Sequence, residues 1–174
     1  PEEILCEAQN CGCAEVVLTG INISAYNYEN CDLAGLLDVL ASLEKRIRLG
    51  SVECGVIDER FLQACRNLKN FAPQFHLSLQ SGSDSVLRAM NRRYTREDYL
   101  RKVEKLRAAV PGIGLTTDLI VSFPGETEKQ FEDTCSLVRE VGYDAAFTFI
   151  YSPREGTRAA AMEGRIPEAE STRR

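Results

Sequence analysis

Small and polar residues follow each of five short apolar stretches of the sequence. The side chains there that could bind a ligand are amides, carboxylates and hydroxyls, namely Asn22, Glu53, Gln80, Ser81, Ser83 and Asp118. They suit an amino-acid or ribose group, and Gly20 and Gly82 would let a ligand approach the backbone. Each loop alone has an ordinary turn composition, but five such loops together favour a ligand site.

The chemistry predicted for these residues is binding rather than acid–base catalysis. The sequence pairs no nucleophile with a base, and its one histidine, His76, has apolar neighbours and is expected in or behind the core. A Walker loop, a dinucleotide glycine fingerprint and a Gly-x-Ser-x-Gly elbow are absent. We therefore expect the loops to hold a cofactor that brings its own reactivity.

Seven cysteines are present, an odd number, and most lie in predicted helices or strands. This favours reduced thiols in a cytoplasmic protein over a disulfide scaffold. Cys11-Gly12-Cys13, with Cys6 nearby, could be a pair of metal ligands, but no second pair of cysteines has the spacing of a metal site. We therefore interpret these three as unpaired thiols at a helix end and predict no metal ligand in the chain.

A basic stretch, Arg92 to Arg96, contains one aromatic residue and is the predicted RNA contact. Arg92, Arg93 and Arg154 could bind phosphate or stack on a base. The alternative is a solvated loop at a helix start, because runs of charge usually face water. Both interpretations stay open at this point.

Alternating strands and helices are expected to position these residues. Strand signals cover residues 15–19, 46–50, 74–79, 115–121 and 146–151, and helical periodicity covers 2–13, 32–43, 59–68, 95–109 and 128–141. Four of the helices have an N-cap residue at their start, namely Asp32, Asp58, Thr95 and Thr127, and Gly142 ends the last. This is the pattern of an α/β fold with a parallel sheet, whose strand ends share one edge.

Composition restricts the class of protein. With 21 Lys and Arg against 26 Asp and Glu, the net charge is −5, which argues against a charge-driven nucleic-acid binder. No apolar run is long enough to cross a membrane. We expect one domain over residues 1–163 and a frayed polar tail over 164–174. Because the chain starts at Pro1 with a helix, we also expect it to be a piece of something longer.

Four stretches of sequence together resemble the radical S-adenosylmethionine methylthiotransferases. They are His76-Leu-Ser-Leu-Gln-Ser-Gly-Ser-Asp84, Met90-Asn-Arg-Arg-Tyr-Thr95, Thr117-Asp-Leu-Ile-Val-Ser-Phe-Pro-Gly-Glu-Thr127 and Tyr151-Ser-Pro-Arg-Glu-Gly-Thr157. Residues 17–22 and 46–53 are similar to the same family and lean toward the branch that modifies threonylcarbamoyl-adenosine beside the tRNA anticodon. Residues 147–153 are also similar to the isopentenyl-adenosine branch.

The resemblance implies a partial TIM-type (βα)6 radical-SAM barrel with the second to sixth βα units present. It implies an enzyme that adds a methylthio group to C2 of a modified adenosine, with tRNA as partner and S-adenosylmethionine and a 4Fe–4S cluster as cofactors. By position, the resemblance assigns cofactor contacts to Gly20, Asn22, Glu53, Gln80, Ser81 and Asp118. The oligomeric state is not predicted.

The family's C-x3-C-x2-C cluster motif is absent from this sequence and is expected upstream of Pro1. The chain alone is therefore expected to be inactive. Cys54 stands where the family usually has proline, Ser122 where it has glycine, and Arg158 where it has proline. Two alternatives remain: a fragment of the sibling enzyme that modifies a ribosomal-protein aspartate, and a cluster-less barrel that only binds a nucleoside or a partner.

Overall fold

The computed structural model describes all 174 residues and divides them into two compact units. Unit 1 comprises Pro1–Leu77 and Lys102–Leu115, and unit 2 comprises Ser78–Arg101 and Thr116–Arg174. The single domain expected over residues 1–163 stays a prediction. Each unit has its own buried apolar residues and is described separately.

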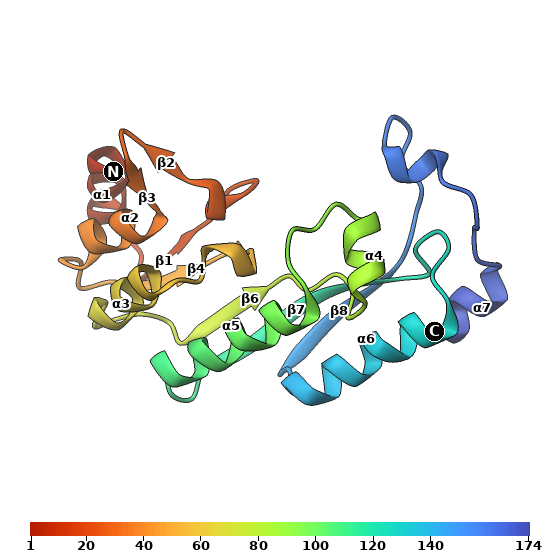
Figure 1. Ribbon diagram of the computed structural model, residues 1–174. Helices are drawn as coiled ribbons and strands as arrows, with labels where there is room; N and C mark the ends of the chain where they lie inside the picture. Colours follow the sequence, from red (N-terminus) through yellow and green to blue (C-terminus); the bar gives the residue numbers. More distant parts are fainter. The chain divides into compact units, whose positions relative to one another are not determined.

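Unit 1 consists of short parallel strand pairs packed with helices (Figure 1). Strand β1 (Glu15–Leu18) pairs in parallel with β4 (Arg46–Leu49), and β5 (Ser51–Val52) pairs in parallel with β6 (Gln74–Leu77). A small antiparallel pair, β2 (Asn27–Tyr28) and β3 (Cys31–Asp32), precedes the second helix. Parallel pairing with helices between the strands is the pattern that the sequence predicted.

The helices of unit 1 are α1 (Glu2–Asn10), α2 (Leu33–Leu40), α3 (Glu59–Asn67) and the second half of α5 (Arg96–Ala109). The Asp32 carboxylate accepts from the Gly35 N–H at 2.9 Å, and Asp58 accepts from Phe61 N–H at 2.8 Å. Both predicted N-caps are thus confirmed. The core of this unit is apolar and fully buried, and includes Leu37, Leu40, Ile47, Leu49, Ile57, Phe61 and Phe75.

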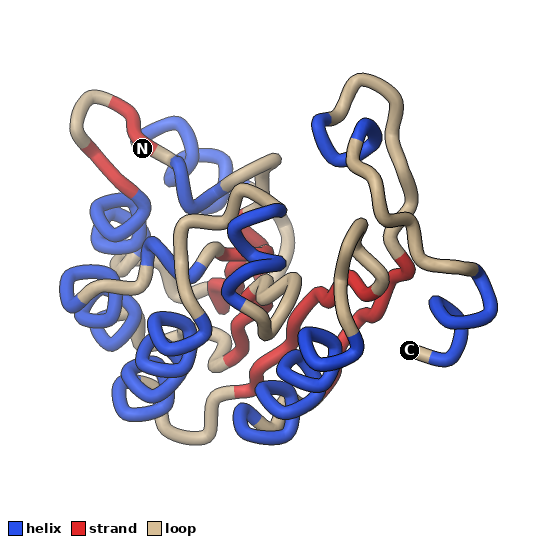
Figure 2. Tube along the Cα trace, turned by 45° about the vertical axis from the view of Figure 1, so that its right-hand side comes forward, coloured by secondary structure: helices blue, strands red, loops and turns tan.

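Unit 2 is built on two long parallel strands that run side by side in Figures 1 and 2, β7 (Gly114–Val121) and β8 (Ala145–Ile150). Their register runs from Thr116 opposite Ala145 to Val121 opposite Ile150. The connection between them is α6 (Glu128–Val141), which has the complete capping box of Thr127 and Gln130 and ends at Gly142 in the left-handed conformation. Helix α4 (Asp84–Ala89) was not predicted.

The C-terminal segment differs from the predicted frayed tail. Residues Glu168–Arg173 form helix α7, and the Arg174 guanidinium is buried against the Glu126 carboxylate at 3.0 Å. Arg173 pairs with Glu128 and Glu170, both at 2.6 Å. The contacts that hold this segment in place are ionic, so its sequence is polar. Hydrophobic periodicity therefore could not predict the helix.

The five predicted strands and five predicted helices are confirmed to within a few residues. Helix α1 stops at Asn10 instead of Cys13, and the strands of two residues each escaped detection because they are too short to show alternation. No helix in the structure combines the length and apolar character needed to cross a membrane.

Candidate functional site

A cavity of about 520 Å³ in unit 2, which we call the β7–β8 cavity, contains several predicted ligand-binding side chains. Its walls combine aromatic and aliphatic groups with a few polar ones: Gln80, Asp118, Ile120, Phe149, Ile150, Tyr151, Ser152, Arg154, Thr157 and Ala159. A mainly apolar pocket with a small number of polar groups is the usual composition of a small-molecule site.

The alternation of β7 explains why Asp118 and Ile120 both line this cavity. Side chains two residues apart on a strand point to the same face. The other face carries Thr117 and Leu119, which are buried in the core. Asp118 is half-buried, so its carboxylate is in a region where hydrogen bonds are stronger than in bulk water.

Gln80 reaches the β7–β8 cavity because the chain leaves its strand in an unusual conformation. Its φ is +70°, a left-handed value that costs a non-glycine residue about 1–2 kcal/mol. Two backbone bonds to β7 hold it there: Gln80 N donates to Asp118 O, and Ile120 N donates to Gln80 O, each at 2.9 Å. The strain is local to the predicted site, which is where such residues tend to gather.

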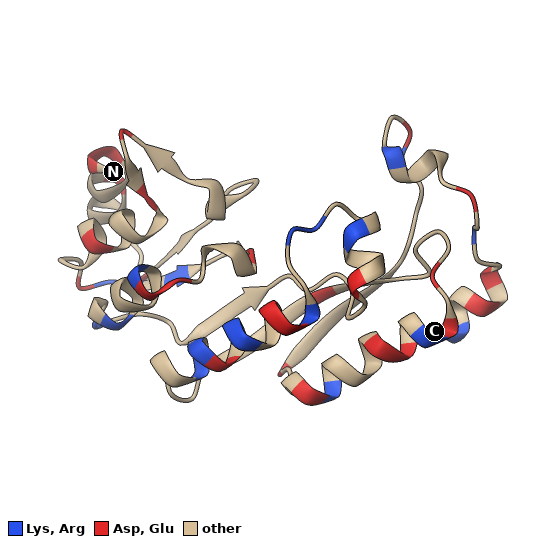
Figure 3. Cartoon of the chain, viewed as in Figure 1, with Lys and Arg blue, Asp and Glu red and all other residues tan.

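A second cavity of about 370 Å³ shares four wall residues with the first, among them Gln80 and Tyr151. Arg92 and Arg158 line it, whereas Arg154 lines the β7–β8 cavity. The loop between α4 and α5 that carries Arg92 and Arg93 is blue in Figure 3. Arg93 is exposed, so two of the three predicted RNA-contact arginines line these cavities and the third faces solvent.

Tyr151 lines both cavities and was not among the predicted site residues. Its ring meets that of Phe123 edge-on at 5.2 Å, and its hydroxyl is buried without a hydrogen-bond partner. Such an oxygen is normally satisfied by a bound ligand or an ordered water. The sequence signal was available, because Tyr151 ends a predicted strand, but aromatic residues at strand ends are also common in cores.

The remainder of the predicted Gln-Ser-Gly-Ser cluster lies outside the β7–β8 cavity: Ser81 and Gly82 contact helix α6, and Gly82 and Ser83 line a separate cavity of about 320 Å³. Ser81 is fully buried, and its Oγ lies 3.3 Å from Thr134 Oγ1. Gly82 N donates to the same hydroxyl at 2.9 Å. A Cβ at Gly82 would lie 2.6 Å from the Thr134 Cα. The close approach to the Gly82 backbone that the sequence allows for a ligand is thus made by helix α6 on this side of the residue.

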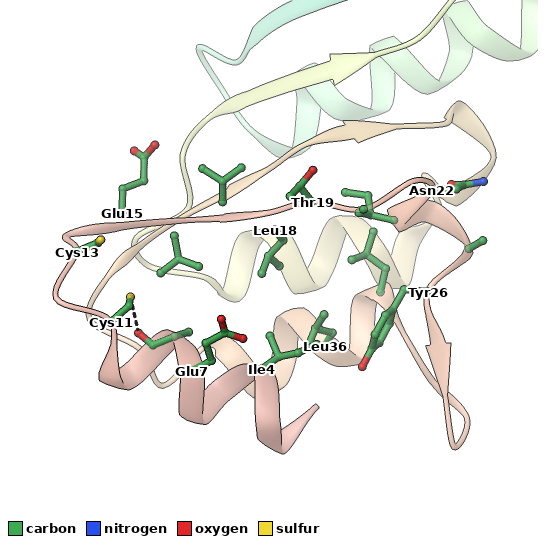
Figure 4. A pocket seen from close by; sticks show the side chains of 17 residues that line it. Ile4, Glu7, Cys11, Cys13, Glu15, Leu18, Thr19, Asn22, Tyr26 and Leu36 are labelled. Carbon is green, nitrogen blue, oxygen red and sulfur yellow. Dashed lines mark hydrogen bonds between the residues drawn. The ribbon is translucent and has the colours of Figure 1, made fainter.

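The predicted residues of unit 1 lie in two loops that touch. Gly20 and Asn22 line a separate, mainly apolar cavity of about 580 Å³, with Asn22 at one end of it (Figure 4). Glu53 is exposed and does not line that cavity, but its N–H donates to Ser24 Oγ at 2.8 Å. The loops after β1 and β5 thus meet, as expected for the carboxyl ends of parallel strands.

No group of three or more His, Cys, Asp or Glu side chains in the structure is placed to hold a metal ion. The cysteines are all free thiols, and two of them, Cys54 and Cys65, are buried. An iron–sulfur cluster held by three thiolates therefore does not fit the residues of this chain.

The radical SAM superfamily matches the sequence over residues 1–138. Two similar proteins are the tRNA-2-methylthio-N(6)-dimethylallyladenosine synthases of Anoxybacillus flavithermus, 46% identical over 96% of this chain, and of Caldicellulosiruptor saccharolyticus, 45% identical over 97%. The chain covers 33% and 37% of these relatives, about a third of their length. Their names specify dimethylallyladenosine, so the predicted leaning toward threonylcarbamoyl-adenosine is not supported.

Solved structures show the same fold at low sequence identity. Streptococcus suis SuiB superposes with a TM-score of 0.60 at 17% identity, covering 99% of this chain and 37% of its own. The cobalamin-dependent S-adenosylmethionine radical enzyme OxsB also gives 0.60, at 13% identity, covering 79% of this chain and 21% of its own. With its parallel α/β fold and a family match over 138 residues, the chain belongs to the radical SAM superfamily.

Proposed function

We propose that this chain forms part of the barrel of a tRNA methylthiotransferase that modifies C2 of N6-dimethylallyladenosine. The observation that carries the proposal is identity of 45–46% to synthases of that name across at least 96% of the chain. The matched region spans both units of the chain. The activity requires the further two thirds of length that the relatives have.

The β7–β8 cavity is the part of the chain that we propose for an adenosine group, of the cofactor or of the substrate. Phe149 and Tyr151 offer ring faces or edges for a base, and Asp118 and Gln80 offer hydrogen-bonding groups for a ribose. The buried Tyr151 hydroxyl without a partner is one atom that such a ligand would satisfy. A bound S-adenosylmethionine would supply radical chemistry at this site.

The charged side chains at the cavity rims have a separate proposed role. Arg154 and Arg92 each line a cavity that contains Gln80, so a phosphate of bound tRNA at either rim would meet a guanidinium. Gly20, Asn22, Glu53 and Ser81 remain predictions for the cofactor. Of these, Ser81 is the weakest candidate, because its hydroxyl is fully buried against α6.

Because no three thiols here are placed to bind iron, we propose that the cluster ligands belong to the complete protein outside these residues and that the chain alone is inactive. What this chain contributes in this proposal is a cavity with aromatic and polar walls that binds and orients an adenosine. That contribution is testable without any assumption about the missing ligands.

The test replaces the matching third of the Geobacillus kaustophilus synthase, which is 45% identical to this chain, with residues 1–174. The purified chimera is first checked for iron content and folding. It is then incubated with tRNA, and the methylthio groups formed in the tRNA are measured by nucleoside mass spectrometry. We expect activity on dimethylallyladenosine and none on threonylcarbamoyl-adenosine. A folded, iron-loaded chimera that is inert, or that prefers the second nucleoside, would refute the proposal.

An Asp118→Asn chimera tests the proposed site within that protein. Loss of a hydrogen bond to a charged group costs about 1.5–3 kcal/mol, so kcat/KM should fall about 10- to 100-fold. Glu132→Gln on the exposed side of α6 is the matched carboxylate control and should leave activity unchanged. Equal effects from both variants would remove Asp118 from the site.

A further inference from the structure

Two cysteines that the proposed function does not use lie at one end of the 580 Å³ cavity of unit 1. Cys11 follows the last residue of α1, and Cys13 lies two residues before β1. Both line the cavity, and Figure 4 shows their sulfur atoms at the end opposite Asn22. Cys13 is exposed and Cys11 is half-buried, so both are within reach of a small solute.

A lysine ammonium is held against the Cys11 sulfur. Lys45 Nζ lies 3.3 Å from Cys11 Sγ, and it also donates to the backbone carbonyls of Gln9, at 3.1 Å, and of Cys11 itself. These carbonyl bonds hold the end of the lysine side chain at the end of α1, beside the sulfur. A fixed positive charge at a sulfur is a standard way to favour a thiolate.

Cys13 adds two further contacts to the same sulfur. The pKa of the Cys11 thiol is held below its ordinary value, with the Cys13 backbone N–H as the largest cause, followed by the Lys45 ammonium and, more weakly, by the Cys13 thiol. Burial opposes this shift. In the neutral form, Cys11 Sγ donates instead to Ala8 O at 3.3 Å, as Figure 4 shows.

Other charges near the two thiols leave this arrangement intact. Glu7 and Glu15 also line the cavity. The Glu15 carboxylate is bound by Arg48 at 2.8 Å and by Arg46 at 3.2 Å, so its negative charge is compensated. A Cβ at the intervening Gly12 would meet nothing within 4 Å, so no packed atom opposes movement on that side of the residue. Glycine between the two cysteines also allows the backbone conformations that closing a ring requires.

We propose that Cys11, Cys13 and Lys45 form a redox-active dithiol site that is oxidised by low-molecular-weight disulfides. The Cys11 thiolate attacks one sulfur of the small disulfide, forms a mixed disulfide and releases one small thiolate. The Cys13 sulfur, losing its proton to solvent, then attacks Cys11 Sγ and releases the second small thiolate. Two protein thiols are oxidised to a Cys11–Cys13 disulfide, and one small disulfide is reduced to two thiols.

The test equilibrates the full chain with mixtures of oxidised and reduced glutathione, blocks free thiols with iodoacetamide and cleaves after glutamate. Cleavage after Glu7 and Glu15 places Cys11 and Cys13 in one peptide, residues 8–15, and leaves exposed Cys6 in another. We expect the 8–15 peptide to lose two hydrogens and gain no glutathione at ratios where Cys6 remains free. Glutathione added equally to the three cysteines, or no oxidation at any ratio, would overturn the proposal.

Variants separate the steps. Cys13→Ser should stop the reaction at a mixed disulfide on Cys11, whereas Cys11→Ser should leave Cys13 no more reactive than Cys6. In the parent chain at pH 7, monobromobimane should alkylate Cys11 at least about fivefold faster than Cys6. Lys45→Met should abolish most of that advantage and move the midpoint of the alkylation pH profile upward, whereas Lys45→Arg should retain it.

The Lys45 variants also test the competing view that the lysine only caps helix α1. If Lys45→Met loosens α1, which circular dichroism detects, the Cys13→Ser result still decides whether Cys11 is the attacking sulfur. If the alkylation rate and pH midpoint are the same with Met, Arg and Lys at position 45, the lysine has no part in the site and the proposal fails.

Discussion

Replacing Gly82 with alanine should push helix α6 away from the loop that follows β6 and so destabilise the contact between them. The new Cβ would lie 2.6 Å from Thr134 Cα and 2.7 Å from Asp133 O, both in the backbone of α6. Ordinary contacts begin at 3.4 Å, so the helix and the loop must separate by about 0.8 Å. A backbone cannot rotate away as a flexible side chain would, so the whole helix or the loop must shift.

The magnitude follows from that displacement. Displacing the helix also pulls on the 2.9 Å bond from Gly82 N to Thr134 Oγ1, which joins the same two segments and is expected to break. Overpacking costs about 1–3 kcal/mol and the lost bond about 1 kcal/mol. Alanine also restricts the unfolded chain, which offsets about 0.4–1 kcal/mol. The net loss of stability should be about 2–3 kcal/mol.

Urea unfolding followed by circular dichroism measures the loss, and amide hydrogen exchange locates it in α6. The matched control is Gly55→Ala, because a Cβ at Gly55 would meet nothing within 4 Å. That variant should stay within about 0.5 kcal/mol of the parent. If Gly82→Ala is as stable as the control and exchange in α6 is unchanged, the clash does not exist and Gly82 is free to serve a ligand after all.

Two further predictions concern pH. Burial raises the pKa of Glu126, against the opposing effects of the Ser122 N–H and of Arg174, so the folded state holds this proton more tightly than the unfolded one. The contribution of Glu126 to stability must therefore fall as the pH rises above about 4.3, the ordinary pKa of a glutamate side chain. Urea unfolding from pH 4 to 7 should show the parent losing stability relative to Glu126→Gln as the pH rises. Glu170 has the opposite sign: hydrogen bonds from Arg173 and then Arg174 lower its pKa to about 2. The docking of α7 that it supports should be complete above about pH 4.3 and weaken toward pH 2, with faster amide exchange in residues 168–173, and Glu170→Gln should remove this acid sensitivity. A flat pH response in either parent-to-variant comparison would contradict the assigned contacts.

The regular elements of the fold could be predicted because each has a local cause. Asp32, Asp58 and Thr127 are caps that their own sequence neighbours reveal, and the structure contains each cap bond. Thr95 and Asp98 likewise bond to each other, at 2.8 Å between the hydroxyl and the carboxylate. Interactions within four residues of the chain are visible in sequence, since they need no knowledge of tertiary packing.

What escaped prediction depends on partners distant in sequence. Arg174 is buried only because Glu126, 48 residues earlier, is buried with it. Lys45 reaches Cys11 from 34 residues away, so the sequence showed a cysteine pair without the ammonium that changes its chemistry. No periodicity or motif encodes such pairs, and the two-residue strands give too little pattern to detect.

The Gln-Ser-Gly-Ser segment shows why residue type alone could not define the site. All four residues are small or polar, and the sequence predicted cofactor contacts at Gln80 and Ser81, a further hydrogen-bonding group at Ser83 and close backbone approach at Gly82. The left-handed backbone at Gln80 turns the chain, so Gln80 lines the β7–β8 cavity while Ser81 and Gly82 meet Thr134 of α6. Adjacent residues therefore line a cavity and contact a helix, respectively, and a change at Gly82 that moves α6 reaches Gln80 through the backbone they share. The strained backbone at Gln80 lies where the chain passes from the cavity wall to the contact with α6. A pattern of residue types cannot show this change of direction, because it depends on a single dihedral angle.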